Sequence, residues 1–206
     1  MVVDLTHVIH PKMPVYPGTT PPFFESGTSL EEDGFLEKKI SFFSHTGTHM
    51  DAPAHIIPHA KTLDALHVSH FQGAAVCIDV RGEKITKVDI LPFKEQLDGA
   101  DFVIFRSRWS RYWGEARYFE DFPTLNEEAA HFLCTCGLKG IGLDMISIDP
   151  VEEESLPIHH IILGHGMVII ENLTNLEALP RCFTFFALPL HVQDADGAPV
   201  RAIASF

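Results

Sequence analysis

The sequence predicts a mixed α/β fold in which strands are concentrated toward both ends of the chain. Short apolar segments typical of buried strands alternate with segments of helical periodicity along its middle. Of its 206 residues, 46% are hydrophobic and 21% are charged, as expected of a folded protein with a substantial core. Because no break in composition divides the chain, we expect residues 1–206 to form a single domain.

The first part of the chain predicts an ordered loop that is followed by a strand. The proline-rich run at 11–22 keeps apolar residues throughout, which favours an ordered irregular loop over a flexible linker. Residues 39–44 have strand character and lead directly into a segment rich in histidine.

The remainder predicts strands that alternate with helices. Pro92 interrupts the first helical pattern, while Thr124 and Glu127 form a capping box at the start of the second, which Gly137 should end. The expected helical segments are 86–97, 124–136 and a turn at 158–163, and the expected strands are 74–80, 101–107, 140–144, 167–170, 181–188 and 200–206.

Composition and charge exclude several functions. A formal charge of −13 argues against binding nucleic acid or an anionic membrane surface, because both require a basic patch. No apolar run approaches the roughly 18 residues that span a bilayer, and no secretory signal is visible at the start. The four cysteines lack the spacing of a zinc knuckle or a thioredoxin motif, so we expect core thiols in a reducing cytoplasm.

The most informative segment is His-Thr-Gly-Thr-His-Met-Asp-Ala-Pro-Ala-His, which begins at His45. It contains His45, His49, Asp51 and His55, whose side chains can bind a metal or carry a proton. A helix would point Asp51 away from the histidines, whereas in an extended chain the odd positions share one face. Gly47 would leave an opening on that face for an ion, and the segment must curve for both imidazoles to reach it.

A metal site is not the only interpretation of this segment, since a polar loop with surface histidines would also fit. Six of the thirteen histidines lie between positions 45 and 70, which weakens that alternative. Further ligands would have to come from elsewhere in the chain. Glu171 follows an apolar strand, and His159 and His160 share a helical turn, but the residues alone do not choose between these two histidines.

Motifs along almost the whole chain carry a resemblance to a known family: Asp4-Leu-Thr-His7, Pro14-Val-Tyr16-Pro-Gly18, His45-Thr-Gly-Thr-His49-x-Asp51-x-Pro53-x-His55, Gly142-Leu-Asp144 and His159-x-x-Ile-Leu-x-x-Gly166-x-x-x-x-Glu171-Asn-Leu-Thr-Asn-Leu176. On these motifs the chain resembles the cyclase family of metal-dependent hydrolases, which includes bacterial kynurenine formamidase (arylformamidase) and isatin hydrolase. The resemblance implies a mixed sheet that closes into a barrel-like core of the swivelling β/β/α type, flanked by helices. It also implies a homodimer or a larger homo-oligomer.

The same resemblance assigns roles to individual residues. His55 matches the proton donor and acceptor. His159 is preferred to His160 because it lies twelve residues before Glu171, and whether His160 or His165 assists the site stays open. Imidazole and carboxylate ligands together suit Zn²⁺ or Mn²⁺, with one or two ions per subunit. The implied metal ligands, among which Asp51 would bridge two ions, are His45, His49, Asp51, His159 and Glu171.

The implied reaction is hydrolysis of a small amide or formamide by a metal-activated water, with N-formylkynurenine as a candidate substrate. Tyr16 takes the place of a tryptophan that contacts the aromatic substrate in related kynurenine formamidases, and it offers a smaller face for stacking. One alternative keeps this chemistry on a cyclic amide, an ester or a lactone, as in isatin hydrolase. Another is a non-catalytic metal- or ligand-binding protein, against which His55 argues because binding alone needs no proton carrier.

Overall fold

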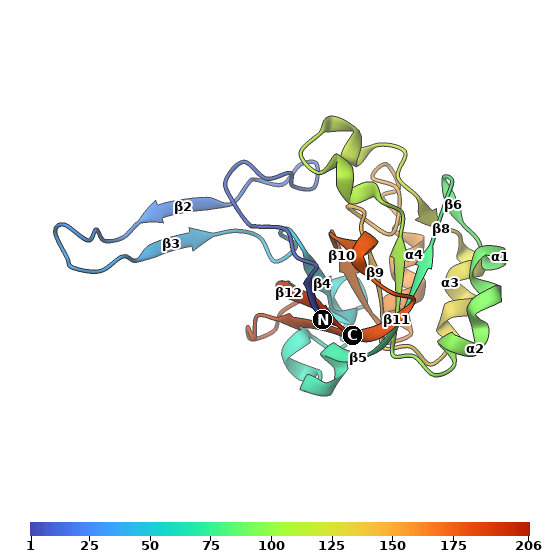
Figure 1. Cartoon of the computed structure of the whole chain (residues 1–206). Helices are drawn as coiled ribbons and strands as arrows, with labels where there is room; N and C mark the ends of the chain where they lie inside the picture. The colour runs from blue at the N-terminus through green and yellow to red at the C-terminus, as the bar shows by residue number, and fades with distance from the viewer.

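The centre of the molecule is a sheet that closes into a barrel (Figure 1). In the computed structural model, which describes residues 1–206, eight strands form this sheet: β1 (Val2–Asp4), β4 (His49–Asp51), β5 (Gln72–Asp79), β7 (Phe102–Arg106), β9 (Gly140–Leu143), β10 (Val168–Glu171), β11 (Cys182–Pro189) and β12 (Gly197–Ser205). They pair in the order β1-β12-β11-β5-β7-β9-β10-β4, and β4 also pairs with β12. This last pairing closes a ring of seven strands and confirms the predicted barrel-like mixed sheet.

Neighbouring residues of the barrel strands face two different apolar layers. In β7, Phe102 and Ile104 point into the barrel, whereas Val103 and Phe105 point toward the helices. All four side chains are fully buried. Strands β5, β7, β9 and β10 run parallel to one another, and a parallel strand covered on both faces has a continuous apolar sequence.

Helices cover one side of the barrel (Figure 1). They are α1 (Lys87–Ile90), α2 (Lys94–Leu97), α3 (Glu127–Cys134) and α4 (Pro157–Gly164). Pro92 lies in the 3-10 turn η4 between α1 and α2, which confirms the expected interruption. The 3-10 turns are η1 (Pro53–His55), η2 (Leu63–Ala65), η3 (Val68–Phe71), η4 (Leu91–Phe93), η5 (Trp109–Tyr112), η6 (Ala116–Phe119) and η7 (Leu176–Ala178).

The capping box predicted at Thr124 is wrong. Thr124 belongs to the short strand β8 (Thr124–Leu125), which pairs with β6 (Lys84–Ile85), and its hydroxyl accepts a hydrogen bond from Lys84 at 2.8 Å. The cap of α3 is Asn126, whose side chain accepts from the Ala129 backbone N–H at 2.9 Å. Strand pairing therefore moves the start of the helix by two residues, because asparagine is as good a cap as threonine.

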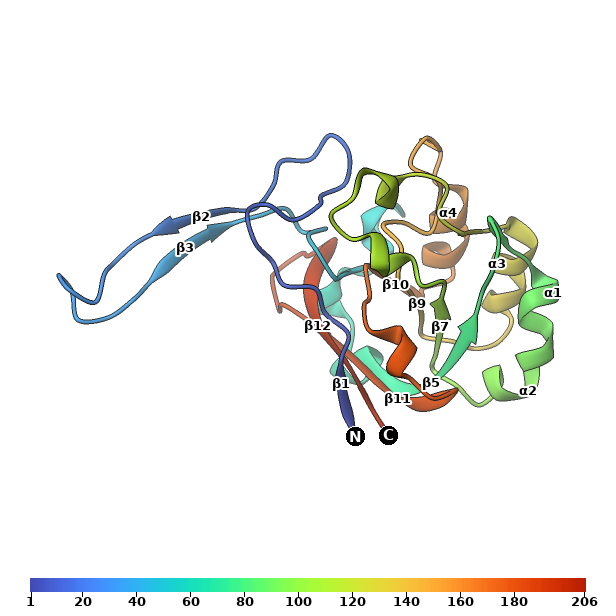
Figure 2. The ribbon, with the colours of Figure 1, turned by 45° about the horizontal axis from the view of Figure 1, so that its top comes forward.

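A two-stranded hairpin, β2 (Phe23–Ser26) and β3 (Lys38–Ser41), projects away from the barrel (Figures 1 and 2). The strand predicted at 39–44 is confirmed only as far as residue 41, and the remaining residues lead irregularly toward β4. Since β3 pairs only with β2, neither strand is buried in the barrel.

The cysteines follow their expected placement only in part. Cys77 and Cys136 are buried, as predicted for core thiols, but Cys182 is exposed at the start of β11, and none of the four is paired. None of the helices has the length and apolar character required to cross a membrane.

Candidate metal centre

The short strand β4 sets the geometry of the site. His49 and Asp51 share one face of it, while Met50 between them is fully buried in the barrel core. His49 lies directly opposite Glu171 of β10 in the antiparallel register. Its Nε2 atom is 3.3 Å from Asp51 Oδ1 and 3.6 Å from Glu171 Oε2. The pairing of β4 with β10 therefore brings two carboxylates and an imidazole to one point.

The backbone turns at Gly47, as the spacing of the segment requires. Gly47 has a φ of +66°, a conformation that favours glycine, and the turn places His45 Nδ1 2.7 Å from Asp51 Oδ1. The expected opening for an ion beside Gly47 is wrong. A Cβ added there would meet Met13 at 3.3 Å and Ile9 at 3.4 Å, so residues near the N-terminus already occupy that space.

Helix α4 supplies His159. Asp149, which lies before this helix, accepts hydrogen bonds from the backbone N–H groups of Ile158 and His159 at 3.1 and 3.0 Å. The same carboxylate lies 2.7 Å from Nδ1 of His159. Nε2 of His159 consequently faces Asp51 at 3.8 Å and Glu171 at 3.6 Å. Asp149 thus caps the helix and orients the imidazole with one side chain.

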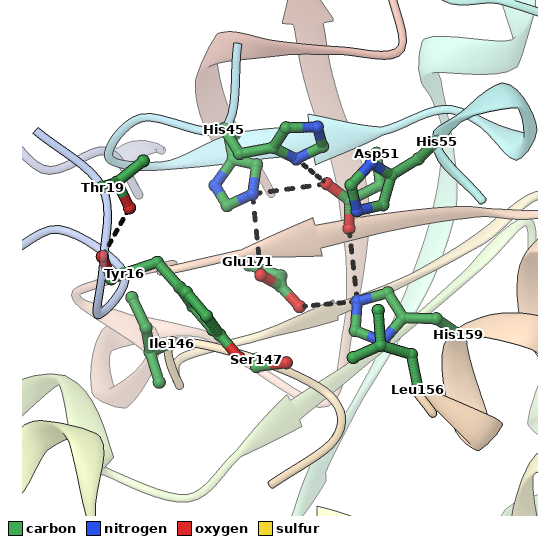
Figure 3. A pocket seen from close by; sticks show the side chains of 11 residues that line it. Tyr16, Thr19, His45, Asp51, His55, Ile146, Ser147, Leu156, His159 and Glu171 are labelled. Carbon is green, nitrogen blue, oxygen red and sulfur yellow. Dashed lines mark hydrogen bonds and ion pairs between the residues drawn. The ribbon is translucent and has the colours of Figure 1, made fainter. Parts of the chain in front are cut away.

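These residues enclose a cavity of about 310 Å³, a volume that suits a small molecule (Figure 3). We call its buried part the floor, formed by His49, Asp51, His159 and Glu171. We call the partly accessible residues at its edge the rim, formed by Tyr16, His45 and His55 together with Asp196, which contacts His45 without lining the cavity. The cavity is lined by Tyr16, Thr19, His45, His49, Asp51, His55, Ile146, Ser147, Leu156, His159 and Glu171.

At the rim, His55 ends the 3-10 turn η1 and lies above the floor. Its ring centroid is 4.0 Å from that of His45 and 6.2 Å from that of His159. Tyr16 is half-buried, and its hydroxyl donates to the Val151 carbonyl at 3.4 Å. Both side chains therefore face the cavity without belonging to the group of acidic and imidazole donors on its floor (Figure 3).

The floor concentrates charge where water is excluded. Burial and the nearby Asp51 carboxylate raise the pKa of Glu171. Burial alone would lower the pKa of His159, but Asp149 and Glu171 outweigh it and raise that pKa to about 10. Asp51 and Asp196 likewise outweigh burial and raise the pKa of His45 to about 9, whereas burial lowers the pKa of His55 to about 4. The carboxylates raise the pKa of two imidazoles and so stabilise positive charge there, which means that the electrostatics of this cavity favour a cation.

All the predicted site residues line the same cavity in the structure. Two histidines whose part in the site was left open lie outside it. His160 and His165 are exposed and do not line the cavity. Asp149 and Asp196, which contact His159 and His45, were missed by the sequence analysis. No local spacing identifies them, since Asp196 lies 151 residues from His45 and only the closure of the barrel brings the two together.

The residues fit a divalent metal ion. Ligand atoms lie within 4.8 Å of one another in three groups: His45, His49 and Asp51; Asp51, His159 and Glu171; and, at the rim, His45, His55 and Asp196. The first two share Asp51, which is only 1% exposed, and are the candidate ligand groups, whereas the Asp196 side chain in the third is about half exposed. Neutral imidazole and carboxylate oxygen are common ligands of Zn²⁺ and Mn²⁺, and no thiol lies among them.

Comparison with known proteins identifies the family. The model of the family described as "Putative cyclase" matches residues 3–150, and the chain belongs to this family. The chain is 35% identical over 204 residues to a protein named kynurenine formamidase from Bacillus thuringiensis (strain Al Hakam), covering 98% of this chain and 95% of that protein. A kynurenine formamidase from Bacillus mycoides (strain KBAB4) is 34% identical with the same coverage.

Solved structures share the fold over nearly the whole chain. Isatin hydrolase A from Ralstonia solanacearum superimposes with a TM-score of 0.86 at 26% identity, covering 99% of this chain and 91% of that one. A predicted metal-dependent hydrolase from Bacillus stearothermophilus gives a TM-score of 0.83 at 29% identity, covering 99% and 97%.

Proposed function

We propose that this protein is a metal-dependent hydrolase of small amides or formamides, similar to an arylformamidase, with N-formylkynurenine as its candidate substrate. The observation that carries the proposal is the convergence of five imidazole and carboxylate side chains beneath a small cavity, with a further imidazole, His55, above them. The names of the relatives support this reaction, which breaks a C–N bond outside peptides.

In this proposal His45, His49 and Asp51 would hold one ion, and His159 and Glu171 would hold a second ion together with Asp51, which both groups share. We expect Zn²⁺ or Mn²⁺, with one or two ions per subunit. A divalent ion supplies Lewis acidity at this point, which polarises a carbonyl oxygen and makes a water molecule more acidic. The protein holds the ligands so that they are arranged before the substrate binds.

His55 carries the proton in the proposed reaction. Its ring lies above the floor and at the edge of the cavity, where it can meet both a water molecule and the leaving group. A neutral imidazole nitrogen of His55 accepts a proton from the attacking water and then donates it to the departing nitrogen. The role of proton carrier accounts for His55, an imidazole that lies beside the five proposed ligands without being one of them.

The upper cavity binds the organic part of the substrate. Tyr16, Ile146 and Leu156 line it, so an aromatic ring can pack against their side chains. Leu156 holds this position with a φ of +47°, a strained conformation for leucine that is typical of functional sites. We propose that Tyr16 contacts the substrate through its ring.

We further propose that the protein forms a homo-oligomer and functions in the cytoplasm. The projecting hairpin and the segment after it expose Phe23, Ile40 and Phe43, which supports a partner surface on this side of the molecule. The four unpaired cysteines support a reducing compartment. Light scattering coupled to size-exclusion chromatography measures the oligomeric state directly.

The test is an assay of the purified protein after chelation and after addition of Zn²⁺ or Mn²⁺, with an aryl formamide, isatin and an aryl ester as substrates. We expect formate release from the formamide that depends on the metal. His159→Ala should abolish this activity, whereas His160→Ala, one position away and exposed, should retain it. A metal-loaded protein that cleaves only the ester or isatin would overturn the formamidase assignment. Equal rates without metal would overturn the metal-dependent reaction.

A further inference from the structure

A carboxylate outside the predicted ligand set faces the outer side of His45. Asp196 Oδ2 lies 3.1 Å from Nε2 of His45, while Nδ1 on the opposite side of the same ring lies 2.7 Å from Asp51 Oδ1. The imidazole is therefore held between two carboxylates. An imidazole that binds a metal is neutral, with one donor and one acceptor nitrogen. In that state a hydrogen bond donated from Nε2 to Asp196 would leave the lone pair on Nδ1 for the ion.

The residue after Asp196 provides the space that this ring occupies. A Cβ added to Gly197 would lie 2.6 Å from Cε1 and 2.8 Å from Nε2 of His45, distances that real Cβ atoms do not show. Gly197 is the first residue of β12 and pairs with Asp51. The ring of His45 consequently packs directly on the backbone that carries Asp196.

Hydrogen bonds on both sides fix the backbone of Asp196. Its carbonyl accepts from the Ala52 N–H at 2.8 Å, and the preceding carbonyl of Ala195 accepts from the Leu63 N–H at 2.9 Å. The hydroxyl of Ser44 also donates to the Asp196 carboxylate at 3.4 Å. Although this side chain is about half exposed, its position is therefore set by the closed barrel.

We propose that Asp196 is a positioning residue that, together with Gly197, holds the ring of His45 with Nδ1 directed at the metal centre. The inference rests on the metal centre proposed above. A carboxylate that accepts a hydrogen bond from the outer nitrogen of a metal-binding imidazole fixes its tautomer and orientation, and losing such a partner typically weakens metal binding by about 10–100-fold.

His159 provides an internal comparison for this role. Its outer nitrogen, Nδ1, meets Asp149 at 2.7 Å, in a buried position where the same carboxylate also caps α4. Asp196 caps no helix, so its proposed effect on the metal can be separated from an effect on folding. The two pairs place a carboxylate behind one imidazole in each of the two candidate ligand groups.

The experiment measures the affinity of the chelated protein for Zn²⁺ alone by competition with a chromogenic chelator, and records the visible absorption spectrum of the Co²⁺-loaded protein. Asp196→Ala should weaken Zn²⁺ binding by about 10-fold or more and alter the Co²⁺ bands, because the ring of His45 is then free to turn. Asp196→Asn, which retains an acceptor oxygen, should restore part of the affinity. Gly197→Ala should alter the same spectrum by displacing the ring.

Asp194→Asn is the matched control, since Asp194 lies in the same loop and its side chain bonds only to that of its neighbour Gln193. It should leave both the affinity and the spectrum unchanged. Wild-type affinity and an unchanged Co²⁺ spectrum in Asp196→Ala would overturn the positioning role, even if that variant melted at a lower temperature. A wild-type protein that binds neither ion would overturn the proposed metal centre itself, and this inference with it.

Discussion

The floor and the rim of the cavity differ in how their side chains are held. Each residue of the floor is at most 5% exposed, and those residues come from β4, α4 and β10. The residues of the rim come from loops and a 3-10 turn, and all of them remain partly accessible. Ligand geometry tolerates little movement, whereas substrate entry and proton exchange require access to solvent. The difference supports the proposal that the barrel and α4 fix four of the five ligands, whereas the rim supplies the fifth, His45, and the residues that we expect to bind and process the substrate.

The arrangement of the floor carries a cost in stability. Asp51 and Glu171 are two buried carboxylates in one small space, and their proximity raises the pKa of Glu171. Buried like charges are unfavourable unless a cation lies between them. The buried charge persists because the pairing of β4 with β10 and β12 holds these side chains in place.

The largest predicted effect falls on the floor. Asp51→Ala should lower metal content more than any other single substitution, because Asp51 belongs to both groups of candidate ligands. Activity should fall by at least about 10³-fold, since both metal-dependent roles are lost. Elemental analysis of the purified variant and of wild type measures the occupancy, and full occupancy in Asp51→Ala would contradict the bridging assignment.

A change at the rim should separate chemistry from metal binding. His55→Ala should keep most of its metal and lose about 10²-fold or more in kcat, because the proton carrier is absent while the ligands remain. His45→Ala is the paired variant, and we expect it to lose metal as well as activity. A collapse of metal content in His55→Ala would reassign His55 as a ligand, like His45, and leave the site without a separate proton carrier.

Removing Asp149, the buried hydrogen-bond partner of His159 and α4, should lower the stability of the fold. Asp149→Ala leaves the backbone N–H groups of Ile158 and His159 without their acceptor, and unsatisfied buried groups cost about 1–3 kcal/mol each. For the two groups together we therefore expect the free energy of unfolding to fall by about 2–6 kcal/mol, as measured by denaturant titration. Asp196→Ala, at the rim, should lose much less stability. If Asp149→Ala and Asp196→Ala lost the same free energy of unfolding, burial of the carboxylate partner would not be what determines its structural role.

Tyr16 should give the smallest effect. Tyr16→Ala should lower kcat/KM for an aromatic formamide more than for an aliphatic one, and Tyr16→Trp should favour N-formylkynurenine by about 1 kcal/mol, the value of a better aromatic contact. Thermal stability should fall only modestly, because the ring is half-buried. The measurement is kcat/KM for both substrates in wild type and both variants. Equal losses on the two substrates would show that Tyr16 supports the loop and does not select the ligand.

Local patterns predicted most of the strands and, within the segment from His45 to His55, the residues that could bind a metal. The segment from His45 to His55 could be interpreted because its donors lie close together in sequence, and alternation along a strand puts His49 and Asp51 on one face. The resemblance to a family added His159 and Glu171, which the residues alone did not join to that segment. The register between β4 and β10 supplies the physical link.

Contacts between distant parts of the chain explain what the sequence did not predict. Asp196 reaches His45 only because β12 pairs with β4, and a lone aspartate in a loop gives no local signal of that pairing. Thr124 looked like a cap because its role in β8 depends on a partner strand forty residues earlier. The space beside Gly47 looked open because the N-terminal segment that fills it lies far away in the sequence.

The most direct test of the metal centre is anomalous X-ray diffraction from crystals of the wild-type protein, recorded at the absorption edges of zinc and manganese. The account predicts at least one peak on the floor, with Asp51 as a ligand at about 2.0–2.2 Å if the ion is zinc. A second peak would lie between His159 and Glu171 if two ions bind. A metal-loaded crystal with no peak within bonding distance of Asp51 would contradict the account.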